Sequence, residues 1–159
     1  MSREAIIQNL KDTMHETLRF YDMPAPLMKK SYGAGKWTLR QLLVHLSDAE
    51  TVLLDRLRRL ASEKKPVLMA FDENDWAKGL FYKQRDLNLA RQQFETARRN
   101  IIELARALPR RIDKNVGTHS QAGTRTFGQI LKMCASHNDH HLEQLRAIAA
   151  GKKWKPKKK

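Results

Sequence analysis

Proline and glycine divide this chain into four segments, each long enough for a helix and each carrying apolar residues at helical spacing. Met23-Pro24-Ala25-Pro26 ends the first segment, Pro66 follows the second, Pro109 stops the third and Gly151 follows the fourth. Proline cannot continue a helix, and apolar residues three to four apart form one stripe that faces a core. No segment shows strand-like alternation. The sequence therefore predicts an all-α fold, a four-helix bundle.

Capping signals mark where these helices begin. Thr38 with Gln41, and Thr126 with Gln129, have the spacing of a capping box, in which each side chain bonds the other residue's backbone N–H. Asp86 is placed to cap the third helix. These positions predict the starts of the second, third and fourth helices.

The connection between the second and third helices is unusually long, from Lys65 to Arg85. A segment of this length in a compact domain is expected to be ordered and packed. We expect its aromatic residues to anchor it to the bundle, with lining of a pocket mouth as the alternative; they are Phe71, Trp76, Phe81 and Tyr82. Because the connection can span the length of the bundle, an up-down-up-down topology is not assured.

Length and composition fit one globular domain, which we place at residues 1–150. The chain has 159 residues, of which 41% are hydrophobic and 30% charged. No apolar run is long enough to span a membrane or to form a signal peptide. Cys134 is the single cysteine, so no intrachain disulfide can form, and we expect a cytoplasmic protein.

The net charge of +14 is concentrated in part at the C-terminus, where residues 151–159 hold six lysines. We expect this stretch to be a disordered, solvated tail. The alternative is that Lys152–Lys159 bind nucleic acid or another anionic partner, with Trp154 stacking on a base.

Three histidines are the strongest functional signal. His137 and His141 lie one helical turn apart, about 6 Å along the axis, at positions where the pattern calls for apolar side chains. His45, on the flank of the inner face of its own segment, can meet them from a neighbouring helix. The alternative is that His137 and His141 are core histidines that only form hydrogen bonds with neighbouring protein groups. Three neutral imidazoles with an open position suit a catalytic metal better than a structural one.

Other polar residues beside these histidines are candidates for supporting roles. Asp48 could accept a hydrogen bond from an imidazole, orient a substrate or accept a proton, or it could be a solvated surface carboxylate. Gln144 and Asn138 are placed to orient ligands from the last helix. His140 falls at the edge of the inner arc, where it could support the site or simply be exposed.

The two remaining histidines, His15 and His119, are expected to be exposed to solvent.

Two stretches resemble the signatures of the DinB-like (YfiT-like) metal-binding superfamily. Trp37–Glu50, WTLRQLLVHLSDAE, is similar to its second-helix signature, and Ala135–Leu145, ASHNDHHLEQL, to its last-helix signature. The resemblance implies a four-helix bundle, often a homodimer, that holds a divalent ion by His45, His137 and His141. It also implies zinc or nickel as the ion, with iron or manganese in some members. Characterised relatives include thiol S-transferases and a mycothiol-dependent maleylpyruvate isomerase.

Two classes of function follow from these observations. The first is a metal-dependent enzyme acting on a small molecule, either a hydrolase or a transferase that uses a low-molecular-weight thiol. Its reaction would depend on a water or thiolate at the metal, with Asp48 and Gln144 as helpers. The second is a non-catalytic metal-binding module whose basic surface and tail bind an anionic partner. A helical dimer whose ancestral site is inactive is the third possibility.

Overall fold

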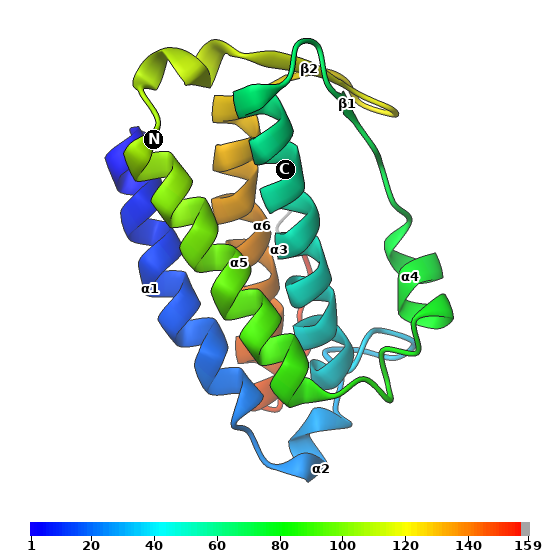
Figure 1. Cartoon of the computed structure of the whole chain (residues 1–159). Helices are drawn as coiled ribbons and strands as arrows, with labels where there is room; N and C mark the ends of the chain where they lie inside the picture. Colours follow the sequence, from blue (N-terminus) through cyan, green and yellow to red (C-terminus); the bar gives the residue numbers. More distant parts are fainter. Residues whose placement is uncertain (157–159) are drawn as a thin grey trace.

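Four long helices form the bundle of this protein, seen in a computed structural model that describes residues 1–156. They are α1 (Arg3–Tyr21), α3 (Leu39–Ser62), α5 (Leu87–Ala107) and α6 (Phe127–Ala149) (Figure 1). Helix α3 packs against both α5 and α6, and α1 packs against the same two helices from the other side. The predicted four-helix bundle is confirmed.

The helix starts agree with the capping signals. Both capping boxes form in full, Thr38 with Gln41 and Thr126 with Gln129. Asp86 accepts hydrogen bonds from two backbone N–H groups at the start of α5. These bonds satisfy donors that the first turn of a helix leaves without partners, which is why these residues fix the boundaries.

Short elements lie between the long helices: α2 (Ala25–Met28), α4 (Glu73–Gly79), a 3-10 helix η1 (Arg110–Lys114), and strands β1 (Val67–Leu68), β2 (Val116–His119) and β3 (Gly123–Thr126). The strands form one small sheet in which β1 pairs parallel to β2 and β2 pairs antiparallel to β3. The sequence shows no strand-like alternation, and this small sheet leaves the fold predominantly helical, as expected. Strands of two to four residues are too short to show an alternating pattern.

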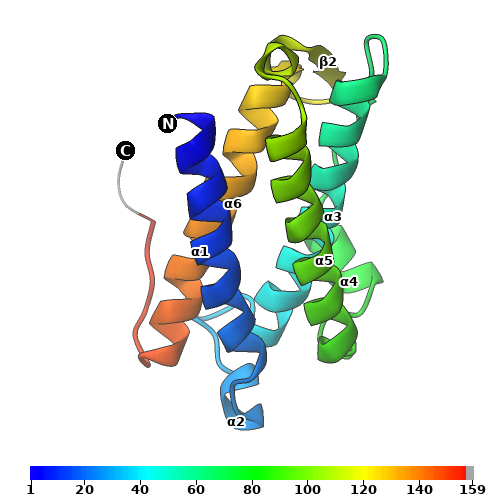
Figure 2. The same cartoon turned by 60° about the vertical axis from the view of Figure 1, so that its left-hand side comes forward.

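The long connection changes the topology of the bundle. It leaves the end of α3, runs down the outside of the molecule through β1 and α4, and enters α5 at the opposite end (Figure 1). Helices α3 and α5 therefore run in the same direction side by side, a relationship that both views show (Figure 2). This arrangement is not up-down-up-down.

Aromatic residues hold the connection in place to different degrees. The Tyr82 side chain is fully buried, and the rings of Phe71 and Trp76 pack together with centroids 4.5 Å apart. Phe81 is 65% exposed and does not anchor the segment. The anchoring role predicted for these residues thus applies to Tyr82 and not to Phe81.

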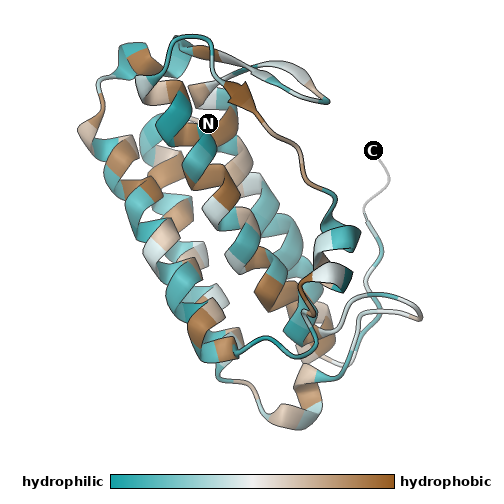
Figure 3. Cartoon of the chain, turned by 45° about the vertical axis from the view of Figure 1, so that its right-hand side comes forward, coloured by the Kyte–Doolittle hydropathy of each residue, from teal (hydrophilic) through white to brown (hydrophobic). Residues whose placement is uncertain are grey.

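The core follows the apolar stripes of the four helices, and hydrophilic and hydrophobic residues alternate along each helix as such stripes require (Figure 3). One charged pair lies within it: Arg98 of α5 and Glu50 of α3 are 0% and 1% exposed. None of the helices within residues 1–156 combines the length and the apolar character needed to cross a bilayer.

The start of the predicted tail is packed against the bundle. After α6 the chain turns back along its outer side (Figure 2), where the backbone N–H of Trp154 donates to the carbonyl of Tyr32. The Trp154 indole donates to Glu143 and its ring packs edge-on against Tyr32 and His140. These contacts leave Trp154 half-buried, while its neighbours from Gly151 to Pro156 are exposed. Lys157–Lys159 lie outside the described residues.

Candidate metal centre

The three histidines singled out by the sequence converge at one point inside the bundle. His45 comes from α3, and His137 and His141 come from adjacent turns of α6. One ring nitrogen of each lies within 4.8 Å of the other two. His45 is fully buried and His141 is 7% exposed, while His137 is half-buried.

The spacing of these nitrogens fits a shared ion. The Nε2 atoms of His45 and His137 are 3.2 Å apart. Two nitrogen ligands on a tetrahedral zinc ion lie about 3.3 Å apart, given Zn–N bonds of about 2.0–2.1 Å. Within residues 1–156, Nδ1 of His45 has no hydrogen-bond partner. The protein therefore leaves one buried nitrogen of this ring without a partner, whereas the other faces the cluster.

Gln144 fixes the orientation of His141. Nδ1 of His141 lies 2.7 Å from Oε1 of Gln144, and because a carbonyl oxygen only accepts, the ring proton resides on Nδ1. The lone pair of Nε2 is thereby left for an ion. The Gln144 amide group in turn donates to Nε2 of His140. The supporting position predicted for Gln144 agrees with this geometry.

Burial keeps the three rings neutral. Burial, together with the smaller effect of the nearby His141, lowers the pKa of His45 to about 3. Burial lowers the pKa of His141 to about 4 against the opposing effect of the Gln144 hydrogen bond. The pKa of His137 is held well below its usual value by burial and by the other two histidines. Neutral imidazole is the form that binds metals.

A pocket of about 400 Å³ opens onto this cluster. Its walls include His137 and His140 of α6, Leu53 and Arg56 of α3, and Phe71 of the connection. Exposed His140 packs against the His141 ring, with centroids 5.1 Å apart, so it lies beside the cluster. The cluster is therefore reachable by a small molecule from the α6 side.

Two candidate supporting residues make other contacts. Asp48 is buried, but it accepts a hydrogen bond from Gln93 of α5 and none from the histidines. It also raises the pKa of Tyr82, after the larger effect of burial. Asn138 bonds Thr17 of α1 and ties two helices together. The burial of Asp48 decides against the surface carboxylate that the sequence left open, and spacing on a helix does not tell which neighbouring helix each side chain meets.

His15 and His119, the two histidines away from the cluster, differ in their exposure. His15 is exposed, as predicted. His119 is half-buried at the end of β2, where its Nδ1 accepts from two backbone N–H groups, so the prediction of exposure was wrong. Strands β2 and β3, which form the hairpin beside it, are too short to be predicted from an alternating pattern.

Two residues near the cluster, Trp37 and Arg56, were missed as functional candidates. The Trp37 ring packs against His45 with centroids 4.9 Å apart. Arg56 is 7% exposed, and it lies three residues after Leu53 and four before Leu60, two buried leucines of the inner face. A charged residue on an apolar stripe is a signal that could have identified it.

Comparison of the sequence with known proteins gives a consistent picture. The sequence model of the DinB superfamily matches residues 8–145. A candidate metal-dependent hydrolase of Oceanobacillus iheyensis is 26% identical over 133 residues, covering 84% of this chain and 77% of the relative. Another candidate metal-dependent hydrolase, from Bacillus cereus, is 22% identical over 149 residues, covering 93% of this chain and 86% of the relative.

Two solved structures share the fold. YfiT from Bacillus subtilis, described as a probable metal-dependent hydrolase with an unusual four-helix bundle topology, superposes with a TM-score of 0.87 at 20% identity, covering 95% of this chain and 89% of that one. A mycothiol-dependent maleylpyruvate isomerase superposes with a TM-score of 0.73 at 14% identity, covering 91% of this chain and 61% of that one. With its family sequence match over most of its length, this chain belongs to the DinB superfamily.

Proposed function

We propose that this protein is a metal-dependent hydrolase of small molecules, with a divalent ion held by His45, His137 and His141. The observation that carries the proposal is the convergence of three neutral ring nitrogens beside an open pocket. Three imidazoles with a further coordination position match catalytic zinc sites. Nickel, iron and manganese also accept imidazole, so metal availability helps decide which ion is bound.

The chain's own residues prepare the site for such an ion. When bound, a divalent ion at an open site lowers the pKa of a coordinated water or thiol and polarises a substrate carbonyl. Gln144 holds the His141 ring so that Nε2 faces the cluster. Burial disfavours the protonated rings that would compete with the ion. Because His137 lies at the pocket wall, a substrate in this pocket would present its reacting end to α6.

Hydrolysis is favoured over thiol transfer by what the chain contains. Cys134 is fully buried, and burial raises the pKa of its thiol, so it is not a nucleophile at neutral pH. A transfer reaction would require a thiol from outside, whereas hydrolysis needs only water. The relatives named as candidate metal-dependent hydrolases support the same choice.

Replacing His137 tests the proposal. We expect His137→Ala to lose both bound metal and turnover while its helicity by circular dichroism stays unchanged. The matched control is His15→Ala, which removes an exposed histidine of α1 and should retain both. Metal is measured by elemental analysis, and turnover with a panel of small esters and amides, with and without added thiols. Turnover that persists in a metal-free variant would refute the mechanism.

A further inference from the structure

Arg56 occupies an unusual position for a charged residue. It belongs to α3, is 7% exposed, and lies in the wall of the pocket that reaches the histidine cluster. Its Nη2 donates to the carbonyl of Met69 on the connection. That single bond explains how Arg56 holds the connection but uses only one of its five N–H donors.

No carboxylate of the described residues forms an ion pair with the Arg56 guanidinium. Its Nε is buried without a hydrogen-bond partner, and no ion pair within residues 1–156 includes Arg56. The adjacent Asp55 carboxylate pairs with Arg59 instead. Burying a guanidinium without a counter-charge is costly, so such a residue is usually completed by an anion.

The rest of the pocket is consistent with an anionic ligand. His119 lines the same pocket, and because its Nδ1 accepts from backbone N–H groups, the proton of the neutral ring is on Nε2, where it is a donor. Burial and the charges of Arg56 and Arg125 lower the pKa of His119. The one carboxylate in the pocket wall, Glu73, is exposed on α4 and makes no ion pair with Arg56.

The middle of the pocket is apolar. Its wall includes the side chains of Leu53, Met133 and Phe71 beside those of Arg56 and His137. Ala49, another wall residue, lies one turn beyond His45 on α3. Arg56 lies seven residues further along the same helix, a distance of about 10 Å along the helix axis. A ligand that uses both ends therefore needs an apolar body of a few carbon atoms between its two polar groups.

We propose that this pocket selects small molecules with an anionic group, which Arg56 binds with help from His119 while the reacting group faces His137. The assignment of the reacting end rests on the proposed function, whereas the anion site at Arg56 does not. The substrate class is thus an acid with a short apolar body, such as a carboxylate that also carries an ester or amide.

Nuclear magnetic resonance of the Arg56 Nε–H group tests the anion site directly. The signal is identified by its loss in Arg56→Lys, and metal-free protein is titrated with glutarate and, separately, with inorganic phosphate. We expect one of these anions to shift the signal saturably, and the preferred one identifies the anion class. No shift with either anion would overturn the proposal, whatever the metal content of the protein.

A second measurement links the two ends of the pocket. Metal-loaded protein is titrated with a short alkyl hydroxamate that ends in a carboxylate and with its uncharged methyl ester. We expect the carboxylate to bind about tenfold tighter or better, because hydrogen bonds to charged groups are the strong ones. Arg56→Gln should abolish this preference without changing the affinity of the ester.

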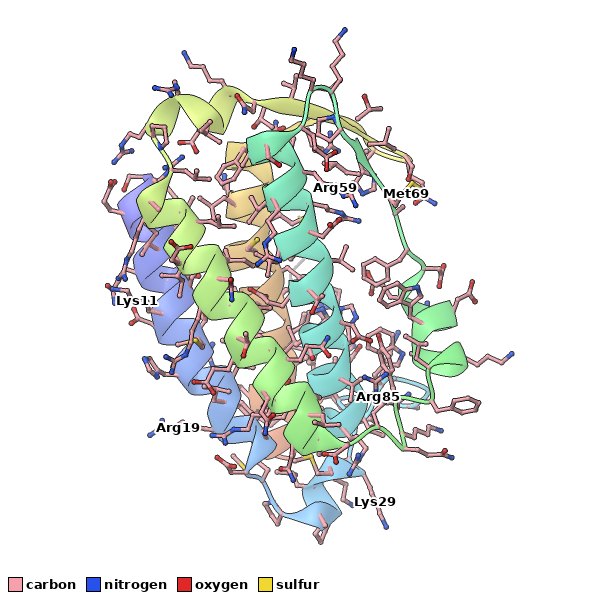
Figure 4. All side chains as sticks on the ribbon, in the orientation of Figure 1. Lys11, Arg19, Lys29, Arg59, Met69 and Arg85 are labelled. Atoms are coloured by element: carbon pink, nitrogen blue, oxygen red, sulfur yellow. The ribbon has the colours of Figure 1, made fainter. Side chains whose placement is uncertain are left out.

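Arg59→Gln is the matched control, because it removes the same charge one turn away. Arg59 pairs with Asp55 and Glu63 and lies outside this pocket's wall, near the C-terminal end of α3, and Met69 follows β1 on the connection (Figure 4). Equal binding of both hydroxamates to the unmodified protein would overturn the proposal. Failure of both to bind would instead count against the metal centre, and the titration of metal-free protein would still decide the anion site.

Discussion

Arg98 and Glu50 face each other at the centre of the bundle and form a two-bond ion pair shielded from solvent. Arg98 Nη2 donates to Glu50 at 2.8 Å, and Nη1 donates to the Leu10 carbonyl and the Thr13 hydroxyl. The pair thus connects α5 to α3 and to α1. It sits five residues beyond His45 on α3, and it helps to hold the helix that carries this histidine.

Glu50→Gln is expected to lower the free energy of unfolding by about 3 kcal/mol or more, because it leaves the buried guanidinium without a counter-charge. Urea denaturation measures the change. The double variant Glu50→Leu/Arg98→Met removes both charges and should be less destabilised than the single variant. A single variant that costs less than about 1 kcal/mol would contradict this account.

Gln144→Leu is expected to weaken metal binding by about 10–100-fold, because His141 then loses the partner that fixes its ring proton on Nδ1. Competition with a chromophoric chelator measures the affinity. Gln144→Glu retains an acceptor and should recover most of the binding. Gln93→Leu, which removes a glutamine that contacts Asp48 rather than the histidines, should leave the affinity unchanged.

The metal-free protein is expected to lose stability as the pH falls from 6.5 towards about 4. The folded-state pKa values of the three histidines are lowered, so the unfolded chain takes up protons that the folded chain does not. Each such proton lowers the free energy of unfolding by about 1.4 kcal/mol per pH unit. Urea denaturation across this range tests the sign. His45→Asn should make the dependence shallower and His15→Asn should not.

Gly117→Ala is expected to destabilise the fold by about 1–3 kcal/mol through overpacking. A Cβ atom at this position would lie 2.8 Å from the carbonyl oxygen of Pro66, where β1 and β2 meet. Thermal unfolding measures the effect. Gly79→Ala, at a glycine with open space around its Cβ direction, is the control and should be neutral. Equal stability of the two variants would contradict this prediction, because it would show that Pro66 moves away from the added Cβ atom at little cost.

Sequence reasoning worked best where a local rule determines the outcome. The capping boxes at Thr38 and Thr126 depend on neighbouring residues alone, so the helix starts were predictable. The shared face of His137 and His141 was also predictable, because residues four apart lie on one side of a helix, whereas their meeting with His45 depends on how α3 packs against α6. Their roles as metal ligands, the residue 150 domain boundary and the homodimer stay predictions.

Long-range contacts set the limit of that reasoning. The pairing of β1 with β2 joins segments about fifty residues apart, and no local pattern encodes it. The partners of Asp48 and Asn138 depend on which helix packs beside each, which follows from the parallel course of α3 and α5. Arg56 was overlooked because its burial depends on the connection folding over it through the Met69 carbonyl.

The separation of the three histidines along the chain ties the assembly of the cluster to the packing of α6 against α3. His45 and His137 are 92 residues apart, and two of the three rings belong to the last helix. A nascent chain whose α6 is still inside the ribosome exposes one of the three histidines, His45, and one imidazole does not form a three-ligand site. Under the proposed function, a cation would therefore bind only after α6 has packed against α3.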